Sequence, residues 1–235
     1  DYDYDCLSYF SMSYNPHGSK SVEYKKKNKN KIAVITWYNE KIKEYADKFS
    51  LINKEYCDKN NYDYIVGHKQ YLSIHRAPSY NKLPFMLDIL NTNKYDYVIW
   101  IDADAHFRTF NKLDKYITGE DLVFSQDIKL EDSINCGVFI CKNTDYTKNF
   151  INEWINIKIK NPDPVCWEQG FLKYICENNL YEIQSHMKVV SYGELQDFNI
   201  DGDALIFHMA GGHKRNKDRL DYINSKLSIK KKIKM

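Results

Sequence analysis

The sequence predicts an α/β fold in which a mostly parallel central sheet is flanked by helices. Three short apolar segments, at residues 32–36, 62–68 and 95–102, alternate with two longer segments at 40–60 and 79–92. The longer segments have apolar side chains at helical spacing, as the first shows with Ile42, Tyr45, Phe49, Ile52 and Tyr56. A β-α-β-α-β order is typical of parallel strands joined by helical crossovers.

The sequence of the second half of the chain predicts further strands and helices and contains no internal repeat. Strands are expected at residues 121–127, 134–143, 188–192 and 204–212, and helices at 146–159 and 167–179. We expect one domain over residues 31–224, preceded by an N-terminal arm or linker at 1–30. Residues 225–235 form a basic tail, which we expect to be solvated and frayed; contact with an anionic membrane surface is the alternative.

The composition excludes several classes of protein. Lys and Arg number 34 against 32 Asp and Glu, a net charge of +2, so the basic excess of nucleic-acid-binding proteins is missing. Six cysteines without a C-x-x-C pair predict buried free thiols rather than zinc ligands or a disulfide framework. The sequence lacks a membrane-length apolar run, a signal peptide and an N-x-S/T sequon. We therefore expect a cytoplasmic location, in the host cytoplasm for a viral protein, rather than the Golgi lumen.

Two aspartates follow the third expected strand. In "YDYVIWIDADAHF", Asp102 and Asp104 come directly after a buried apolar run. Ligands of parallel sheets bind outside the carboxyl ends of the strands. If the chain turns there, the two carboxylates converge into an oxygen site suited to Mg²⁺ or Mn²⁺. A solvated strand end is the alternative, and we favour the metal.

Other phosphate-handling motifs do not fit. Phosphatases of the haloacid dehalogenase type carry their D-x-D on the first strand, with Thr or Val two residues later, where this chain has His106. A G-x-x-x-x-G-K-[ST] phosphate loop and a G-x-S-x-G nucleophile elbow are both missing from the sequence.

Several segments together carry a family resemblance. "VIWIDADAHF", "INCGVFICKN", "WEQGFLKYI" and "IFHMAGGHK" occur in the order found in GT-A glycosyltransferases, after "NKEYCDKNNYDYIV" and "RAPSYNKLPFML". Over about residues 31–220 the chain resembles the galactosyl/mannosyl/xylosyltransferase group of glycosyltransferase family 34, especially relatives encoded by large DNA viruses. The resemblance implies a GT-A fold and transfer of a hexose, pentose or deoxyhexose from a UDP-sugar to a glycan or glycoprotein, with retention of configuration.

The resemblance also implies a metal and nucleotide site. Mn²⁺ or Mg²⁺ would be held by Asp102, Asp104 and His208, and Lys214 would face the diphosphate. The other residues implied at the donor are Thr36, Trp37, Tyr38, Arg76, Lys82, Ala103 and Gly211. For His208 the alternative is a core histidine, and His213 is an alternative ligand. His106 is expected to have a supporting or structural role.

The sugar side of the site is implied by "WEQGF" and "INCGVF". Glu168 and Gln169 would line the donor and acceptor pocket and stabilise the reacting sugar, although the family more often has Asp where Glu168 stands. An alternative for Glu168 is an ordinary acidic residue in a first helical turn. Asp127, Asn135 and Gly137 are expected to make sugar-hydroxyl or backbone contacts. Two other functions stay open: a sugar-nucleotide- or carbohydrate-binding domain with weak or no turnover, and a metal-dependent phosphatase.

Overall fold

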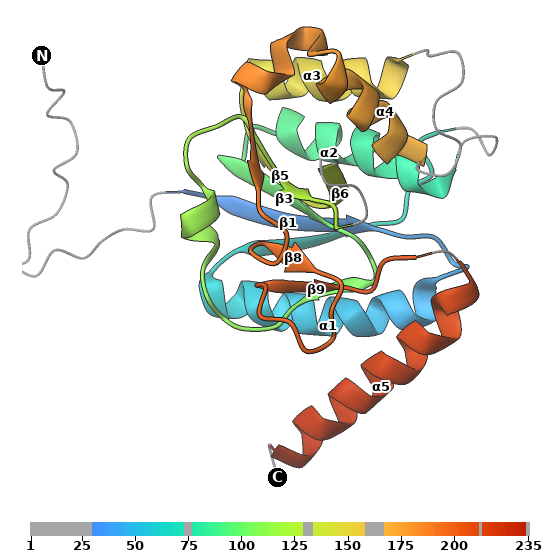
Figure 1. The fold of residues 1–235 in the computed structure, drawn as a ribbon. Helices are drawn as coiled ribbons and strands as arrows, with labels where there is room; N and C mark the ends of the chain where they lie inside the picture. Colours follow the sequence, from blue (N-terminus) through green and yellow to red (C-terminus); the bar gives the residue numbers. More distant parts are fainter. Residues whose placement is uncertain (1–29, 73–76, 129–133, 158–166, 212, 234–235) are drawn as a thin grey trace, which may run out of the picture. The chain divides into compact units, whose positions relative to one another are not determined.

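The computed structural model describes residues 30–233 apart from 73–76, 129–133, 158–166 and 212 (Figure 1). Residues 1–29 of the expected arm, and Arg76, lie outside the described residues. From Lys31 on, the described residues form one compact unit.

The first half of this unit is the expected β-α-β-α-β run. β1 (Ile32–Trp37) is followed by α1 (Lys43–Asn60), β2 (Asp63–Gly67), the 3₁₀ turn η1 (Pro78–Asn81), α2 (Lys82–Asn91) and β3 (Tyr97–Ile101). β1 pairs in parallel with both β2 and β3. α1 ends where Asn61 adopts a left-handed conformation (φ 59°), which an asparagine tolerates better than most residues.

The second half completes the main sheet and adds a smaller one. Its elements are β4 (Ala105–Phe107), η2 (Leu113–Tyr116), β5 (Leu122–Gln126), β6 (Ile134–Lys142), α3 (Asp145–Asn156), α4 (Trp167–Glu177), η3 (Leu180–Ser185), β7 (Met187–Val190), β8 (Gln196–Asp197), β9 (Ile206–His208), η4 (His213–Arg215) and α5 (Asn216–Ile233). The main sheet has six strands in the order β2-β1-β3-β6-β5-β7. Only β6 runs against the rest of this sheet. The predicted mostly parallel sheet is therefore confirmed.

The reversed direction of β6 matters for the site. Because β6 is antiparallel to β3, its first residues lie beside the carboxyl end of β3, where Ile101 pairs with Val138. The backbone N–H of Asp102 donates to the Gly137 carbonyl at 2.8 Å, just beyond that pair. The "INCGVF" stretch therefore starts at the same edge as the two aspartates.

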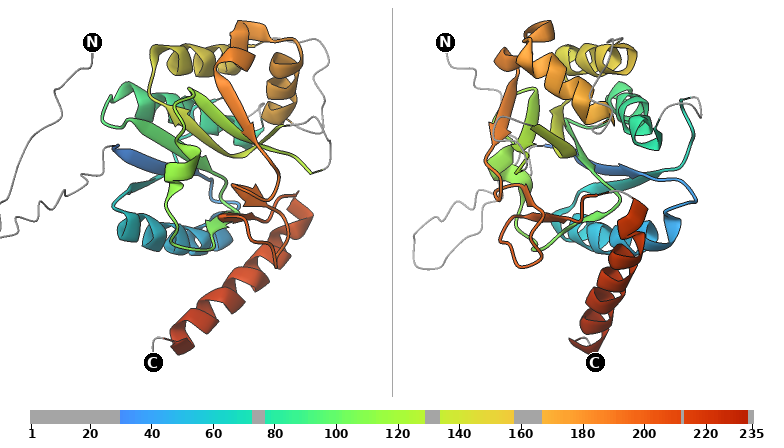
Figure 2. Two further views of the ribbon diagram at one scale, coloured as in Figure 1. Left: turned by 60° about the vertical axis from the view of Figure 1, so that its left-hand side comes forward. Right: turned by 45° about the vertical axis from the view of Figure 1, so that its right-hand side comes forward.

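Helices cover both faces of the main sheet (Figures 1 and 2). Alternation along β1 explains the two layers: Ala33 and Ile35 join the core under α2, α3 and α4, whereas Val34 joins the core on the α1 side. A third apolar cluster joins α1 to α5 through Phe49 and Ile223. The four cysteines within the described residues, Cys57, Cys136, Cys141 and Cys176, are buried free thiols, as predicted.

The C-terminal segment differs from expectation. Residues 225–233, predicted to fray, continue the helix α5. Ile223, just before this segment, is buried, and Leu227 within it packs against the cluster shared with α1. Such tertiary packing supplies most of a helix's stability. None of the helices within the described residues has the length and hydropathy needed to cross a membrane.

Asn53 of α1 connects this helix to the short strand β4. Its amide Nδ2 donates to the Ala105 carbonyl at 2.9 Å, and its Oδ1 accepts from the Phe107 N–H at 3.1 Å, all within the core. We expect Asn53→Ala to lower the free energy of unfolding by roughly 2–4 kcal/mol, because two buried backbone groups lose their partner. Urea denaturation measures this change.

The control is Asn152→Ala on the exposed face of α3, where the side chain accepts from Asn156. This variant should stay within about 0.5 kcal/mol of the parent. Equal losses in both variants would contradict the role given to Asn53.

Candidate active site

Asp102, Asp104 and His208 meet at the carboxyl edge of the main sheet. One ligand atom from each lies within 4.8 Å of the others. His208 Nε2 is 3.4 Å from Asp104 Oδ1 and 3.6 Å from Asp102 Oδ2. The turn required to bring the i and i+2 carboxylates together is present, closed by the Ala105 N–H donating to the Asp102 carbonyl at 3.0 Å.

The pairing of β4 with β9 brings the histidine to this turn. Ala105 is the register partner of His208, and the Met209 N–H donates to the Asp104 carbonyl at 2.9 Å. Backbone hydrogen bonds therefore close the long loop between the D-x-D segment and "IFHMAGG".

Gln196 on β8 fixes the orientation of the His208 ring. The Gln196 Nε2 donates to Asn135 Oδ1 at 2.8 Å, which leaves its Oε1, an acceptor, facing His208 Nδ1 at 3.0 Å. Nδ1 therefore donates this hydrogen bond, and Nε2 faces the two carboxylates. A hydrogen bond of this kind to the far nitrogen is characteristic of metal-binding histidines.

Gly137 leaves room for the same ring. A Cβ at this position would lie 2.2 Å from His208 Cε1, closer than any real contact. Its backbone N–H donates to Asn135 Oδ1 at 2.8 Å. The glycine in "NCGVF" is thus explained by the histidine packed against it.

Each aspartate has one oxygen held by the protein and the other directed at His208. Asp102 Oδ1 accepts from Trp100 Nε1 at 2.7 Å and lies 3.2 Å from Lys82 Nζ. Asp104 Oδ2 lies 2.7 Å from a terminal nitrogen of Arg219. The oxygens that remain, with His208 Nε2, form a donor set of two carboxylate oxygens and one imidazole nitrogen, which suits Mn²⁺ and accommodates Mg²⁺.

The surroundings shift the pKa values of the two carboxyls in opposite directions. Burial raises the pKa of Asp102, although the charges of Lys82 and His208 oppose the rise. Burial acts the same way on Asp104, but its contact with His208 and the charge of Arg219 outweigh burial and hold its pKa below the ordinary value. Asp104 is therefore the more firmly ionised of the pair.

A cavity of about 320 Å³ opens beside these carboxylates. Six predicted donor-site residues line it: Trp37, Lys82, Asp102, Ala103, Asp104 and Gly211. Its other lining residues are Asn39, Lys41, Ile42, Tyr45, Pro78, Ser79, Trp100 and Arg219. The cavity is thus bounded by the ends of β1 and β3, the start of α2 and the loop after β9.

Three other predicted donor residues stand apart from the cavity lining. Thr36 is buried in β1, and Tyr38 is buried with its hydroxyl donating to Asp47 Oδ1 at 2.6 Å. Lys214 is exposed on η4, three residues beyond Gly211.

Glu168 and Lys82 form a buried ion pair at the wall of the cavity. Lys82 Nζ lies 2.7 Å from Glu168 Oε1, and Ser79 Oγ donates to Oε2 at 2.5 Å. Burial alone would lower the pKa of Lys82, but Asp102 and Glu168 raise it well above its ordinary value. Lys82 therefore stays a cation and contacts both Asp102 and Glu168. The two carboxylate oxygens of Glu168 are thus engaged, one by Lys82 and the other by Ser79.

Asp127, Asn135 and Gln169 come together in one hydrogen-bond network. Asp127 Oδ2 accepts from Gln169 Nε2 at 3.0 Å and from Asn135 Nδ2 at 3.3 Å. Since Asn135 also accepts from Gln196, the network continues to His208. The predicted sugar-side residues and the predicted metal ligand thus belong to one connected group.

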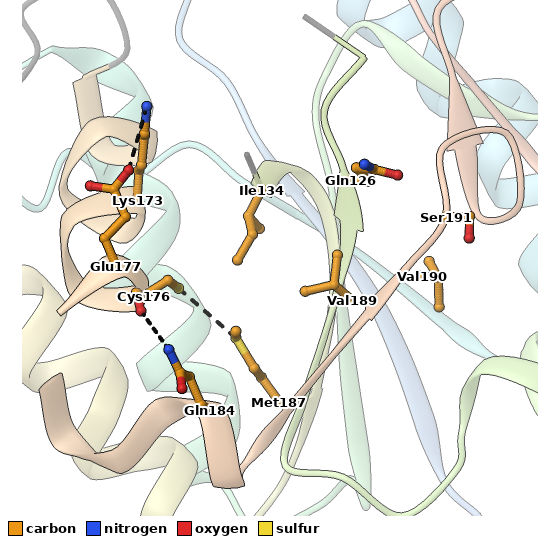
Figure 3. A pocket seen from close by; sticks show the side chains of 10 residues that line it. All are labelled: Gln126, Ile134, Lys173, Cys176, Glu177, Gln184, Met187, Val189, Val190 and Ser191. Carbon is orange, nitrogen blue, oxygen red and sulfur yellow. Dashed lines mark hydrogen bonds and ion pairs between the residues drawn. The ribbon is translucent and has the colours of Figure 1, made fainter. Parts of the chain in front are cut away.

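A second cavity, of about 500 Å³, lies between α4 and the edge of the sheet (Figure 3). Gln126 and Ile134 line it and directly adjoin Asp127 and Asn135 in the sequence. Met187 and Val189 of the edge strand β7 add apolar surface. The sequence analysis singled out none of its lining residues.

The structure adds three residues that the sequence analysis missed: Ser79, Gln196 and Arg219. Gln196 lies on a two-residue strand, too short for any periodicity, and Arg219 is one of several basic residues near the start of α5. His106 has the expected structural role, because its Nε2 lies 2.8 Å from the Tyr222 hydroxyl within the core. The side chain of His213 lies outside the described residues.

Gly137→Ala tests the packing of the histidine. The added methyl group must displace the His208 ring, so we expect the affinity for Mn²⁺, titrated calorimetrically in the presence of UDP, to fall roughly 10- to 100-fold. Cys141→Ala, farther along the same strand, is the control and should leave this affinity unchanged. Parent-like Mn²⁺ affinity in Gly137→Ala would show that the ring position does not govern the site.

Solved glycosyltransferase structures share this fold. A glycosyltransferase involved in the glycosylation of the major capsid of PBCV-1 superposes with a TM-score of 0.69 at 16% identity, covering 83% of this chain and 99% of that one. The glycosyltransferase GlyE of Streptococcus pneumoniae TIGR4 gives 0.55 at 15% identity, covering 82% of this chain and 60% of its own. The bifunctional glycosyltransferase WbbM also gives 0.55, at 12% identity, covering 83% and 50% respectively.

At these identities the likeness establishes the fold, and it confirms the expected GT-A type of α/β architecture. Membership of glycosyltransferase family 34 stays a prediction. No curated protein sequence matches the chain significantly. A family profile described as "Protein of unknown function, DUF273" matches residues 53–194, more than half of the sequence, and the chain therefore belongs to that family.

Proposed function

We propose that this protein is a metal-dependent glycosyltransferase that uses a UDP-sugar donor. The observation that carries the proposal is the convergence of Asp102, Asp104 and His208 within 4.8 Å, with both aspartates lining a cavity at the carboxyl edge of the sheet. The shared fold of solved glycosyltransferases supports it. The cytoplasmic location expected from the sequence is part of this proposal.

The residues of the cavity take distinct parts in donor binding. Asp102, Asp104 and His208 hold Mn²⁺ or Mg²⁺, which neutralises negative charge on the diphosphate when bound. Trp37 offers its ring to the uracil, since its indole N–H is already committed to the Lys69 carbonyl at 2.8 Å. Gly211, with φ of +137°, lets backbone approach the phosphates, and Lys214 follows it in the chain.

The sugar lies toward Asp127, Asn135 and Gln169, which bind its hydroxyls, while the acceptor is a glycan or glycoprotein. Glu168 is engaged by Lys82 and Ser79, so its part is electrostatic support rather than nucleophilic attack. Retention then follows a front-face course. The bond from the acceptor oxygen to the anomeric carbon forms as the bond to the departing phosphate breaks, and the acceptor proton passes to that phosphate.

A donor screen tests the proposal. Purified protein is incubated with Mn²⁺ and each of a set of UDP- and GDP-sugars bearing hexoses, pentoses and deoxyhexoses, and nucleotide release is followed. A binding domain without turnover would release no UDP. A metal-dependent phosphatase would cleave simple phosphoesters regardless of the nucleotide.

Asp104→Asn tests whether UDP release depends on a metal held by this carboxylate. The amide removes one anionic ligand, so we expect Mn²⁺-dependent UDP release to fall by roughly 100- to 1,000-fold. Asp114→Asn, at an exposed carboxylate on η2, is the control and should keep parent activity. Undiminished UDP release in Asp104→Asn would contradict the assignment of Asp104 as a metal ligand.

A further inference from the structure

We propose that Arg219 of α5 is a positioning residue that holds Asp104 in the orientation required for metal binding. This inference rests on the function proposed above. Arg219 is 2% exposed, and one terminal nitrogen lies 2.7 Å from Asp104 Oδ2. Oδ1 of the same carboxylate is thereby turned toward His208 Nε2, 3.4 Å away.

The guanidinium also holds the loop that follows the third ligand. Its Nε and the nitrogen that contacts Asp104 both donate to the Met209 carbonyl, at 3.2 and 3.1 Å, and the second of these also reaches the Gly211 carbonyl. The other terminal nitrogen donates to Asn216 Oδ1 at 3.0 Å. One side chain thus bridges the D-x-D turn and the chain segment directly after His208.

These contacts argue for positioning rather than for direct phosphate binding. Arg219 lines the cavity, yet each of its three nitrogens is engaged with protein oxygens. A planar guanidinium with several fixed donors suits this use better than a lysine ammonium, because it holds several acceptors at defined angles.

Through Arg219, the C-terminal helix α5 contributes a side chain to the site. Arg219 lies one turn before Ile223, which is buried against α1. α5 thus contacts α1 through an apolar side chain and the D-x-D turn through Arg219. The "HKRNKDRL" segment, in which the sequence pointed to His213 and Lys214, also contains the supporting residue Arg219.

Two effects on metal affinity oppose each other. Arg219 places a positive charge near the metal and would by itself weaken cation binding. If positioning dominates, removal of the guanidinium weakens Mn²⁺ binding; if repulsion dominates, removal strengthens it. The sign of the change therefore distinguishes the two.

The experiment uses Arg219→Met, Arg219→Lys and the packing control Ile223→Ala. Mn²⁺ binding in the presence of saturating UDP is measured by electron paramagnetic resonance of free Mn²⁺, and thermal unfolding is followed in parallel. We expect a 10- to 100-fold loss of affinity in Arg219→Met. Arg219→Lys should lose less Mn²⁺ affinity, because lysine keeps the positive charge but lacks the planar set of guanidinium donors. Ile223→Ala should lower the melting temperature at least as much while keeping Mn²⁺ affinity.

Unchanged or tighter Mn²⁺ binding in Arg219→Met would overturn the inference, and so would an equal loss in Ile223→Ala. If the parent protein itself binds no Mn²⁺ with UDP, the metal assignment fails instead, and Arg219 has no such role. The two failures are thus distinguishable from one set of titrations.

Discussion

The backbone pairing of β4 with β9 is the constraint on which the candidate site depends. It joins the turn after β3 to a strand about one hundred residues later, with Ala105 opposite His208. The pairing consists of main-chain hydrogen bonds in a buried small sheet. It therefore holds the side chains of Asp104 and His208 at the same edge.

Around this pairing the protein compensates an unusual amount of buried charge. Asp104 is matched by Arg219, and Glu168 by Lys82, with Asp102 near the same ammonium. Removing one member of such a group leaves the others uncompensated in a poorly solvated region. The charges are therefore coupled, and Lys82 contacts both Asp102 and Glu168 of α4.

Much of the fold was predictable, for a physical reason. β1, β2, β3, α1 and α2 bury whole faces, so their apolar residues follow the strand or helix period closely. Asp102 and Asp104 were also predictable, since a carboxylate pair directly after a buried strand is unusual. β4 and β8 were not, because strands of three and two residues have no measurable period, and the ordered end of α5 depends on packing against α1.

The residues that contact the site residues could not be predicted from the sequence either. Gln196, Ser79 and Arg219 are ordinary polar residues in sequence, and their importance comes from what lies beside them. Asn135 and Asp127 were expected to face a sugar, and the structure additionally links them to each other and to Gln196. Such links join residues far apart in the chain, which local sequence patterns do not report.

The sequence by itself determined the order of elements, the parallel character of the sheet and the two aspartates at its edge, because periodicity and local burial are encoded over short stretches. Only the tertiary structure decided which nitrogen of His208 faces the carboxylates, why residue 137 is glycine, and which cations balance Asp102, Asp104 and Glu168. Those outcomes depend on distances of a few ångströms between β6, β8, β9, α2 and α5, and these distances exist only after the chain has folded.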